Sequence, residues 1–451
     1  MSRKRIRFGG PARQSATATP TQLEADVQSL GLEGRGVARQ DGKTLFISGA
    51  LPGERVRAQV VNRHKRFDEA QTLEVLQASS ERQTPPCPYY GRCGGCQLQH
   101  LAPAAQIRYK EQLVLDQLQR FADIRPGSVE PPLGSADLGY RRTARIGINQ
   151  RADGELLIGF RRQGSHKLID IDSCAVLEPR INELLAKLRQ LLQDAGNIKH
   201  ITHLDISCGD RSGSLALRIT RRLDDDLLSA LRQLCERQQF KLFLQGNDDR
   251  LQEVETAAPE LTYSLGDAGP ELLFAPGDFL QVNAEINRQM VARALDWLAP
   301  TADERVLDLF CGLGNFTLPL AQRAAEVVAV EGSAAMVERT RDNARRNGLD
   351  NIGVFKSDLS LDIRDTPWYR QAGHEKFDLI LLDPPRAGAE ECVRRLCSYG
   401  ARAVLYIACN PASLVRDAQP LIEAGYRLSR FAVMDMFPHT AHVESMALFE
   451  C

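Results

Sequence analysis

The amino-terminal part of the chain shows short runs in which apolar and polar positions alternate, separated by turns rich in glycine and proline. In the clearest run, residues 55–61, apolar residues occupy one face and Arg55, Arg57 and Gln59 occupy the other. Several short strands with turn signals between them are typical of a small barrel, so we predict an OB-like β-barrel over residues 20–78. The basic face of the 55–61 strand would suit contact with a nucleic acid, although a plain solvated strand fits the same pattern.

The middle of the chain, residues 79–270, mixes helical and strand-like periodicities. Apolar residues recur at helical spacing in three stretches: 106–121, 181–194 and 224–239. Strand-like runs lie at 140–171, 203–207 and 214–219. We therefore predict an α+β central domain, which begins with a loop of Pro, Gly and Cys over residues 81–100.

From residue 271 onward, apolar strands alternate with helical stretches. The strands are expected at 306–310, 327–331, 377–383 and 403–408. This alternation is typical of a doubly wound parallel sheet, and it predicts an α/β, Rossmann-like domain over residues 271–451.

The composition favours a globular protein of several domains over a membrane or secreted protein. The chain has 451 residues, of which 43% are hydrophobic and 25% charged, which is ordinary for a soluble globular protein of several domains. It contains no apolar run of about 18 residues, which argues against a transmembrane helix. The basic start of the chain is not followed by an apolar stretch, which argues against a secretion signal. We expect a cytoplasmic protein.

Charge is balanced overall but unevenly distributed. The formal net charge of -1 gives no sign of a nucleic-acid-binding protein. Residues 1–19 contain Lys and Arg but no acid, and we predict that they form a disordered tail. Basic residues also gather at 141–145 and 161–167, where they could contact RNA or form a solvated surface.

The chain has 11 cysteines, an odd number that does not suit a disulfide framework in a cytoplasmic protein. Metal binding or catalysis is the better explanation. Cys87, Cys93 and Cys96 lie in the predicted loop and could supply three thiolate ligands. Four thiolates would suit an iron–sulfur cluster or tetrahedral zinc, and His100 could complete a zinc site instead of a fourth cysteine.

The strand at 306–310 runs into a turn that contains Gly312 and Gly314. A dinucleotide fingerprint would need a third glycine where Thr317 stands, so NAD fits poorly. Asp308 precedes the turn, and Glu331 ends the next strand, where it could accept hydrogen bonds from a ribose. An acidic turn without nearby Lys or Arg suits a cationic nucleoside such as S-adenosylmethionine better than a pyrophosphate.

Cys409 directly follows the apolar strand at 403–408, and Pro411 is typical of the first turn of a helix. A helix N-terminus lowers the pKa of a thiol, so we expect an available thiolate. A small buried core cysteine is the alternative.

A second candidate for proton transfer lies near the end of the sequence, where His439, His442 and Glu444 could form an acid–base loop. The segment Asp383-Pro384-Pro385 also follows a predicted strand. Similar segments occur in amino-methyltransferases, which leaves the methyl acceptor open.

Six segments together, in their order and spacing, resemble the RNA uracil-C5 methyltransferases. They are GDFLQVN (277–283), LDLFCGLGNFTLPLA (307–321), VEG (330–332), LDPPR (382–386), IACNPASLVRD (407–417) and FPHTAHVESM (437–446). One departure is Pro385, where the family often has Ala; we expect no effect on the chemistry. The resemblance covers nearly the whole chain beyond the tail, because the barrel resembles a TRAM domain and the cysteines resemble the family's [4Fe–4S] site. The family branch that methylates 23S ribosomal RNA combines these two features, whereas the tRNA branch lacks both.

The resemblance implies a role for individual residues. Cys409 matches the nucleophile and Glu444 the base. The residues that match the methyl-donor site are Gln281, Phe310, Asn315, Glu331, Asp358 and Asp383, of which Asp358 stands at a position that varies within the family. The matching cluster ligands are Cys87, Cys93, Cys96 and Cys174. The resemblance also assigns the helix near 101–130 to the methyltransferase domain.

These roles imply covalent catalysis: Cys409 adds to uracil C6, C5 takes the methyl group from S-adenosylmethionine, and Glu444 removes the C5 proton. The expected partner is 23S ribosomal RNA, and we expect a monomer without a membrane or protein partner. Three alternatives stay open: the same chemistry on a tRNA uridine, an amino-methyltransferase, and a non-enzymatic iron–sulfur protein that binds RNA.

Overall fold

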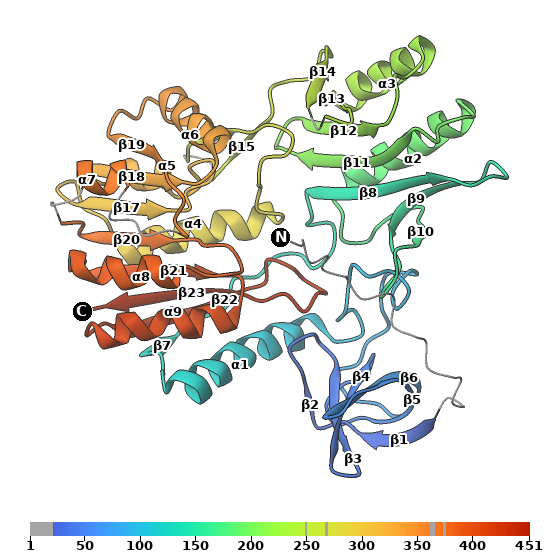
Figure 1. Cartoon of the computed structure of the whole chain (residues 1–451), viewed down its shortest axis with the longest axis horizontal. Coiled ribbons are helices and arrows are strands. Elements are labelled where there is room, and N and C mark those ends of the chain that lie inside the picture. Colours follow the sequence, from blue (N-terminus) through green and yellow to red (C-terminus); the bar gives the residue numbers. More distant parts are fainter. Residues whose placement is uncertain (1–20, 249, 267–268, 361–365, 373–375) are drawn as a thin grey trace, which may run out of the picture. The chain divides into compact units, whose positions relative to one another are not determined.

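The computed structural model describes residues 21–248, 250–266, 269–360, 366–372 and 376–451 (Figure 1). The predicted tail at 1–19 lies outside the described residues. The chain divides after Arg82 into two compact units, which are described separately.

The first unit is a curled six-stranded sheet in the order β1-β5-β6-β4-β3-β2 (Figure 1). Its strands are β1 (Gln22–Asp26), β2 (Ser29–Leu30), β3 (Gly36–Gln40), β4 (Lys43–Ser48), β5 (Arg55–Arg63) and β6 (Phe67–Gln77). Val56 and Ala58 are fully buried in its core, as the alternation predicts. The sequence indicated only a turn where β3 begins. Gly36 is needed there because a Cβ atom would lie 2.8 Å from a Val27 side-chain carbon.

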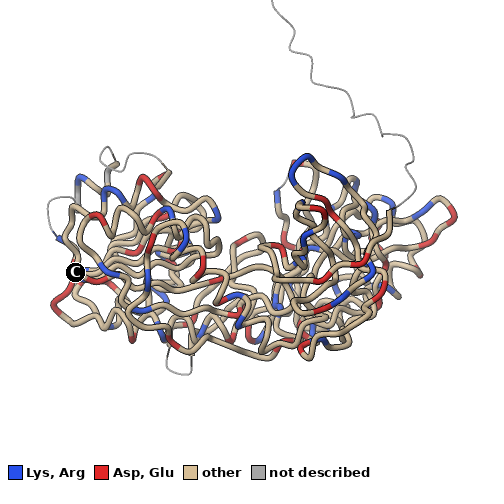
Figure 2. The backbone as a smooth tube through the Cα atoms, turned by 90° about the horizontal axis from the view of Figure 1, so that it is seen from below, with Lys and Arg blue, Asp and Glu red and all other residues tan. Residues whose placement is uncertain are grey.

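Acidic neighbours pair with the basic face of β5. Arg55 donates a hydrogen bond to Glu24 on β1 at 2.9 Å, and Arg57 pairs with Glu74 on β6. Figure 2 shows Lys and Arg interspersed with Asp and Glu along the backbone. The strand therefore offers less unpaired positive charge to a nucleic acid than its sequence pattern indicates.

The second unit contains a seven-stranded sheet in the order β10-β9-β8-β11-β12-β13-β14. Its strands are β8 (Thr143–Gln150), β9 (Leu156–Arg161), β10 (Leu168–Asp170), β11 (Ile201–Cys208), β12 (Gly213–Ile219), β13 (Phe240–Gln245) and β14 (Leu251–Val254). Helices α2 (Pro179–Asp194) and α3 (Asp225–Gln238) share one apolar core with this sheet. Both helices lie where apolar spacing predicts them.

An eight-stranded sheet in the order β19-β18-β17-β20-β21-β23-β22-β7 forms the rest of the unit. Its strands are β7 (Ser128–Val129), β17 (Arg305–Leu309), β18 (Glu326–Glu331), β19 (Ile352–Lys356), β20 (Leu379–Leu382), β21 (Ala403–Ala408), β22 (Arg427–Met434) and β23 (Glu444–Glu450). Strands β17 to β21 are parallel, and β23 lies antiparallel between β21 and β22. The predicted Rossmann-like parallel sheet is thus confirmed.

Helices and a hairpin pack around this sheet (Figure 1). The helices are α4 (Ala284–Leu298), α5 (Thr317–Ala321), α6 (Ala334–Arg346), α7 (Pro367–Ala372), α8 (Glu390–Leu396) and α9 (Pro411–Glu423), and the hairpin consists of β15 (Thr262–Ser264) and β16 (Glu271–Leu273). Within the described ranges, no helix combines the length and the apolar character that crossing a membrane requires.

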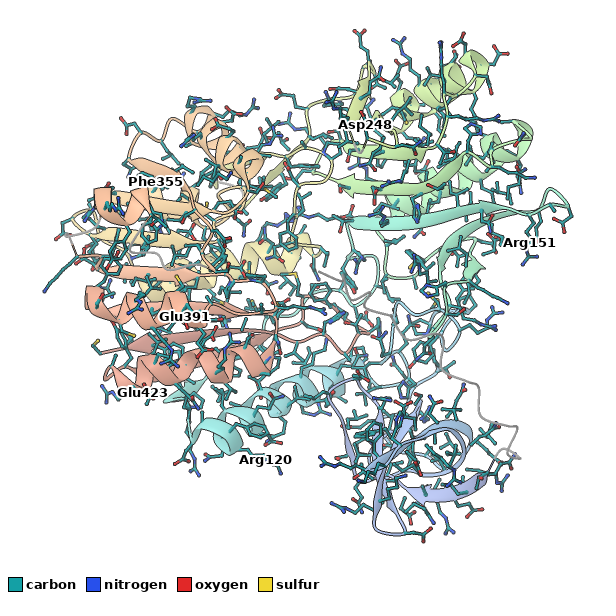
Figure 3. All side chains as sticks on the ribbon, in the orientation of Figure 1. Arg120, Arg151, Asp248, Phe355, Glu391 and Glu423 are labelled. Atoms are coloured by element: carbon teal, nitrogen blue, oxygen red, sulfur yellow. The ribbon has the colours of Figure 1, made fainter. Side chains whose placement is uncertain are left out.

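Helix α1 (Pro103–Ala122) packs on the eight-stranded sheet although it precedes the seven-stranded sheet in the sequence. Val114 and Leu118 are fully buried in the core that contains β20, β21 and α9. The opposite face is exposed, and Figure 3 shows Arg120 on α1 and Glu423 on α9 extending away from the sheet. Strand β7 follows α1 and pairs with β22.

Candidate active site

Cys409 lies between β21 and α9, at the carboxyl edge of the parallel strands. All six residues of β21 are buried, which fixes the end of the strand. Asn410 caps α9, because its side chain accepts a hydrogen bond from the Ala412 N–H at 3.1 Å, and Pro411 occupies the first turn. The thiol is therefore next to a helix N-terminus, as the sequence predicts.

The register of the sheet brings Glu444 and Asp383 to the same edge. Ala408 on β21 pairs with Ser445 on β23, so Cys409 and Glu444 lie at the adjoining ends of two antiparallel neighbours. Asp383 directly follows β20, which pairs with the other side of β21. One thiol and two carboxyl groups from separate strands thus converge.

The prediction that the pKa of the Cys409 thiol is lowered is wrong. Its pKa is raised to about 11, because the thiol is buried and because Glu444 and Asp383 lie near it, whereas Arg386 acts in the opposite direction. A helix N-terminus carries only about half a positive charge, which burial and two carboxyl groups outweigh. Before substrate binds, the structure therefore favours the neutral thiol.

The two carboxyl groups hold protons unusually tightly. Burial and the proximity of Asp383 raise the pKa of Glu444 to about 8, against the influence of Arg386 and Lys110. Burial alone raises the pKa of Asp383 to about 7. Groups that exchange protons near neutral pH suit general acid–base chemistry.

A cavity of about 570 Å³ lies beside this edge and contains three of the predicted methyl-donor residues, Phe310, Glu331 and Asp358. Pro385, which follows Asp383 closely, also lines it. Phe310, which lines the cavity, adopts a left-handed backbone conformation with φ of 63°, which is uncommon for a bulky residue. The cavity suits a nucleoside that stacks on an aromatic ring.

Backbone donors orient the Glu331 carboxylate at the end of β18. It accepts a hydrogen bond from the Gly312 N–H at 3.2 Å and another from the Ser333 N–H at 2.8 Å. Gly312 has φ of 57°, a conformation that glycine adopts without strain. Beneath the turn, Asp308 is fully buried and accepts a hydrogen bond from the Thr317 hydroxyl at 2.5 Å.

Gln281, Asn315 and Asp383 do not contribute to the described lining of that cavity. The Asn315 amide exchanges two hydrogen bonds with Asn287, both of 2.9 Å, and accepts a third from the Tyr263 hydroxyl at 3.3 Å. The Gln281 carbonyl accepts a hydrogen bond from Arg142 Nε at 2.8 Å. In the conformation described, the Asn315 amide therefore joins the glycine turn to Asn287 and Tyr263 and does not line the cavity.

Arg142 differs from the surface position that its basic cluster suggested. It is only 2% exposed, and its guanidinium lies over the Tyr263 ring at 4.6 Å from the ring centre. Arg142 therefore has a structural role in the interior and cannot be reached by RNA.

The four predicted cluster cysteines surround one separate cavity of about 270 Å³. The loop that contains Cys93 is attached to β9 by a hydrogen bond from the Gly94 N–H to the Arg161 carbonyl at 3.1 Å. Cys174 follows β10, and its N–H donates to the Asn182 side chain at 2.8 Å. Burial raises the pKa of Cys96 to about 12, and the other three cysteines contribute in the same direction, so the four sulfurs lie within electrostatic reach of one another.

The four cysteines share the lining of this cavity, but they are not arranged as a ready-made set of metal ligands. Among the residues that the structure describes, no three His, Cys, Asp or Glu side chains form a group that could hold a metal ion. His100 does not line the cavity, and its Nδ1 atom lies 2.5 Å from the Tyr90 hydroxyl.

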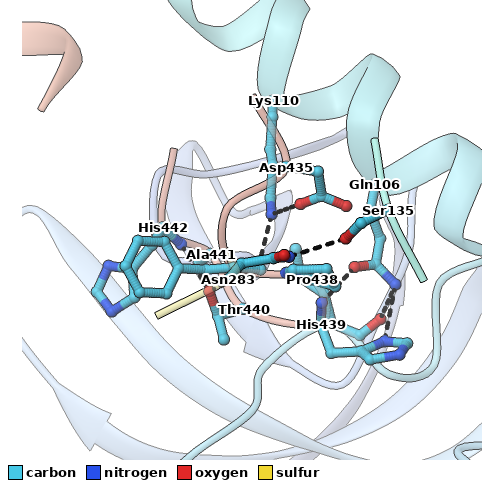
Figure 4. Close-up of polar contacts among 12 residues, drawn as sticks. Gln106, Lys110, Ser135, Asn283, Asp435, Pro438, His439, Thr440, Ala441 and His442 are labelled. Atoms are coloured by element: carbon cyan, nitrogen blue, oxygen red, sulfur yellow. Dashed lines mark hydrogen bonds and ion pairs between the residues drawn. The ribbon is translucent and has the colours of Figure 1, made fainter. Parts of the chain in front are cut away.

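Sequence patterns did not reveal Lys110 and Arg386 as part of the site. Lys110 is fully buried on α1, and its charge lowers the pKa of Glu444. The charge of Arg386 lowers the pKa of both Cys409 and Glu444. His439, suggested as an acid–base group, is fully buried, and its backbone N–H donates to the Gln106 side chain at 2.8 Å (Figure 4). His439 is therefore structural, and the only available signal for Lys110 was a lysine on a helix with apolar spacing.

Comparison with known proteins gives consistent matches. Residues 105–451 match the family described as tRNA (uracil-5-)-methyltransferase. The chain is 47% identical over 447 residues to the 23S rRNA (uracil(1939)-C(5))-methyltransferase RlmD of Pseudomonas aeruginosa strain UCBPP-PA14, covering 99% of this chain and 98% of that protein. A protein of the same name from Alkalilimnicola ehrlichii is 45% identical over 432 residues, covering 95% of this chain and 96% of that protein.

A solved structure shares the fold over most of the chain. It is the Pyrococcus abyssi tRNA (uracil-54, C5)-methyltransferase in complex with S-adenosyl-L-homocysteine, with a TM-score of 0.73 and 22% identity. The match covers 95% of this chain and 100% of that chain.

Proposed function

The chain belongs to the tRNA (uracil-5-)-methyltransferase family, and on this premise we propose that it methylates C5 of a uridine in 23S ribosomal RNA, with S-adenosylmethionine as methyl donor. The near-complete coverage by relatives named for uracil 1939 of 23S rRNA supports that uridine as the target. The observation that carries the chemistry is the convergence of Cys409 and Glu444 at the adjoining ends of β21 and β23.

The first step forms a covalent adduct. The Cys409 thiol loses its proton, the sulfur bonds to uracil C6, and the electron pair of the C5–C6 double bond moves toward C5 and O4. Because the pKa of the thiol is about 11, a neighbouring base must accept this proton, and Arg386 favours the thiolate that results. The uridine must leave its base stack to reach the thiol.

The second step transfers the methyl group and the third releases the product. C5 attacks the methyl carbon of S-adenosylmethionine, whose sulfur–methyl bond breaks to give S-adenosylhomocysteine. Glu444 then takes the C5 proton, the carbon–sulfur bond to Cys409 breaks, and 5-methyluridine leaves. Glu444 must be ionised to act as the base.

We assign the methyl-donor site to Gln281, Phe310, Asn315, Glu331, Asp358 and Asp383. Phe310, Glu331 and Asp358 are supported by their shared cavity, and Glu331 by the two N–H groups that orient its carboxylate. Asn315 and Gln281 rest on the family resemblance, and Asn315 would have to exchange its contact with Asn287 to bind a ligand.

The alternatives receive less support. An amino-methyltransferase would not need a thiol beside a base, and a non-enzymatic RNA-binding protein would not need the carboxyl groups at the sheet edge. The same chemistry on a tRNA uridine is compatible with the site, so it must be tested directly.

Substrate preference distinguishes the two RNAs. Purified unmethylated 23S rRNA should accept methyl groups from labelled S-adenosylmethionine much faster than tRNA does, because the close relatives are named for 23S rRNA. Cys409→Ala assayed on both RNAs is the control for background labelling. Preference for the tRNA would overturn the assignment of the substrate.

We further propose that residues 20–78 form a TRAM domain that binds RNA, that 79–270 form a central domain, and that 271–451 with α1 form the methyltransferase domain. The curled six-stranded sheet supports the TRAM domain. The packing of α1 on α9 supports the assignment of α1 to the methyltransferase domain. A cytoplasmic location follows from a ribosomal substrate.

We also propose a [4Fe–4S] cluster on Cys87, Cys93, Cys96 and Cys174. The four cysteines fit such a group because they line one cavity, and thiolates are its usual ligands. The choice of iron over zinc rests on the family resemblance.

The metal content is directly measurable. Protein purified without oxygen should be brown and contain about four irons per chain. Cys174→Ser should lose the colour, whereas His100→Ala should keep it, because His100 lies outside the cavity lining. A colourless protein with zinc that depends on His100 would contradict the proposal.

A further inference from the structure

A buried lysine holds the segment that leads to Glu444. Lys110 on α1 is fully buried, and its Nζ atom donates to Asp435 Oδ1 at 2.7 Å and to the Phe437 carbonyl at 2.9 Å (Figure 4). Asp435 is also almost fully buried, with 4% of its surface exposed. A buried charge is strongly unfavourable without its partner, so this pair ties the end of β22 to α1.

Further contacts restrain the rest of the segment, residues 435–443. Gln106, one turn before Lys110 on α1, accepts from the His439 N–H at 2.8 Å. The His439 carbonyl accepts from the Gln97 and Leu98 N–H groups at 3.0 and 2.9 Å. Because Glu444 directly follows this segment at the start of β23, these contacts determine where its side chain begins.

The positive charge of Lys110 also lowers the pKa of Glu444. The groups that face Glu444 are Asp383, which opposes ionisation, Arg386 and Lys110, which favour it, and the Cys409 thiol. Arg386 is exposed and has the larger effect of the two on Glu444, and Lys110 adds to it from a fully buried position. Asp435 and Glu444 both favour the charged form of Lys110 against burial.

Other titratable groups lie around the same segment. Lys110 disfavours the charged forms of His439 and His442, and burial does so more strongly. Asp137 favours charged His439, while Arg141 and Arg386 disfavour charged His442. Their titration must be separated from that of Glu444.

We propose that Lys110 is a positioning residue for methyl transfer, which fixes the 435–443 segment before Glu444 and directs a buried positive charge toward the Glu444 carboxylate. Lys110 acts on the reaction only through Glu444. The proposal rests on the proposed function, in which Glu444 removes the C5 proton.

The test uses the full chain with the paired substitution Lys110→Met and Asp435→Asn. This double variant leaves no unpaired buried charge, so its folding can be compared with the parent by thermal unfolding. Lys110→Met alone serves as the second variant. With 23S rRNA, a rapid-quench experiment over a range of pH follows the methylated covalent adduct and the free product separately.

In the double variant, the adduct should still form, and its release at neutral pH should slow by up to about tenfold, the factor that one full unit of pKa gives. The midpoint of the pH dependence of release should move upward, because loss of the lysine charge makes Glu444 harder to ionise. His442→Asn, which keeps Lys110, is measured alongside. If the titration of His442 sets the midpoint of release, this variant should move that midpoint; if Glu444 sets it, the midpoint should stay close to that of the parent. Lys187→Met removes an exposed lysine paired with Glu183 on α2 and should leave release unchanged.

Release equal to the parent in rate and midpoint, or slow release with an unmoved midpoint, would overturn the role of Lys110. A failure of the proposed function has a different signature. If Glu444→Gln releases product normally, Glu444 is not the base, and the proposal for Lys110 falls with that assignment.

Discussion

Cys409→Ala should lose methyl transfer by about 10⁴-fold or more, the order seen when an enzymatic nucleophile is removed. Without the sulfur, uracil C5 has no adduct from which to attack the methyl group. The measurement is transfer of labelled methyl groups to 23S rRNA. A second readout is RNA that contains 5-fluorouracil at the target, which should trap the parent enzyme covalently because fluorine cannot leave as a proton does.

Cys451→Ala is the matched control, since Cys451 is an exposed cysteine whose sulfur contacts the Ala401 carbonyl away from the site. It should keep full activity and form the trapped complex. A covalent complex with Cys409→Ala would show that another residue is the nucleophile.

Glu444→Gln should accumulate a methylated covalent adduct on ordinary RNA, with release slowed by about 10²–10⁴-fold, the usual contribution of a general base. The glutamine keeps the shape of the side chain but cannot accept the C5 proton. Denaturing gels show the adduct, and nucleoside analysis of the bound RNA shows whether it carries the methyl group. Full turnover by this variant would mean that another group, such as Asp383, removes the proton.

The pH dependence gives an independent check of Glu444. Its pKa is about 8, so release by the parent enzyme should increase as pH rises through 8 and then level off. Glu444 also raises the pKa of Cys409, so Glu444→Gln should shift adduct formation to lower pH. Glu450→Gln, at the other end of β23, should change neither profile.

The sequence predicted the parallel sheet well because its central strands β20 and β21 are continuous apolar runs. Cys409 could be recognised because the strand before it and Pro411 after it are local signals. Glu444 was found as a carboxyl group in a loop, and its place opposite Cys409 follows from a strand pairing that periodicity does not reveal.

Features that depend on distant residues could not be predicted. The direction of the Cys409 pKa shift depends on Glu444 and Asp383, which only the folded sheet brings close. The contact between Lys110 and Asp435 joins residues 325 positions apart. Arg142 looked like a surface residue because its neighbours are basic, and only its packing against Tyr263 shows otherwise.

The chain pairs with itself just before the seven-stranded sheet begins and again after that sheet ends. The Arg142 N–H donates to the Val282 carbonyl at 2.9 Å, and Arg141 forms an isolated bridge with Asn283. The intervening segment therefore leaves and rejoins the rest of the unit at one place, so its length can change while the catalytic framework stays closed. Since loop-closure entropy grows only logarithmically with length, such changes are thermodynamically mild. This part of the chain is therefore where we expect homologous enzymes to differ most in size, and where a foreign domain could be exchanged into the protein.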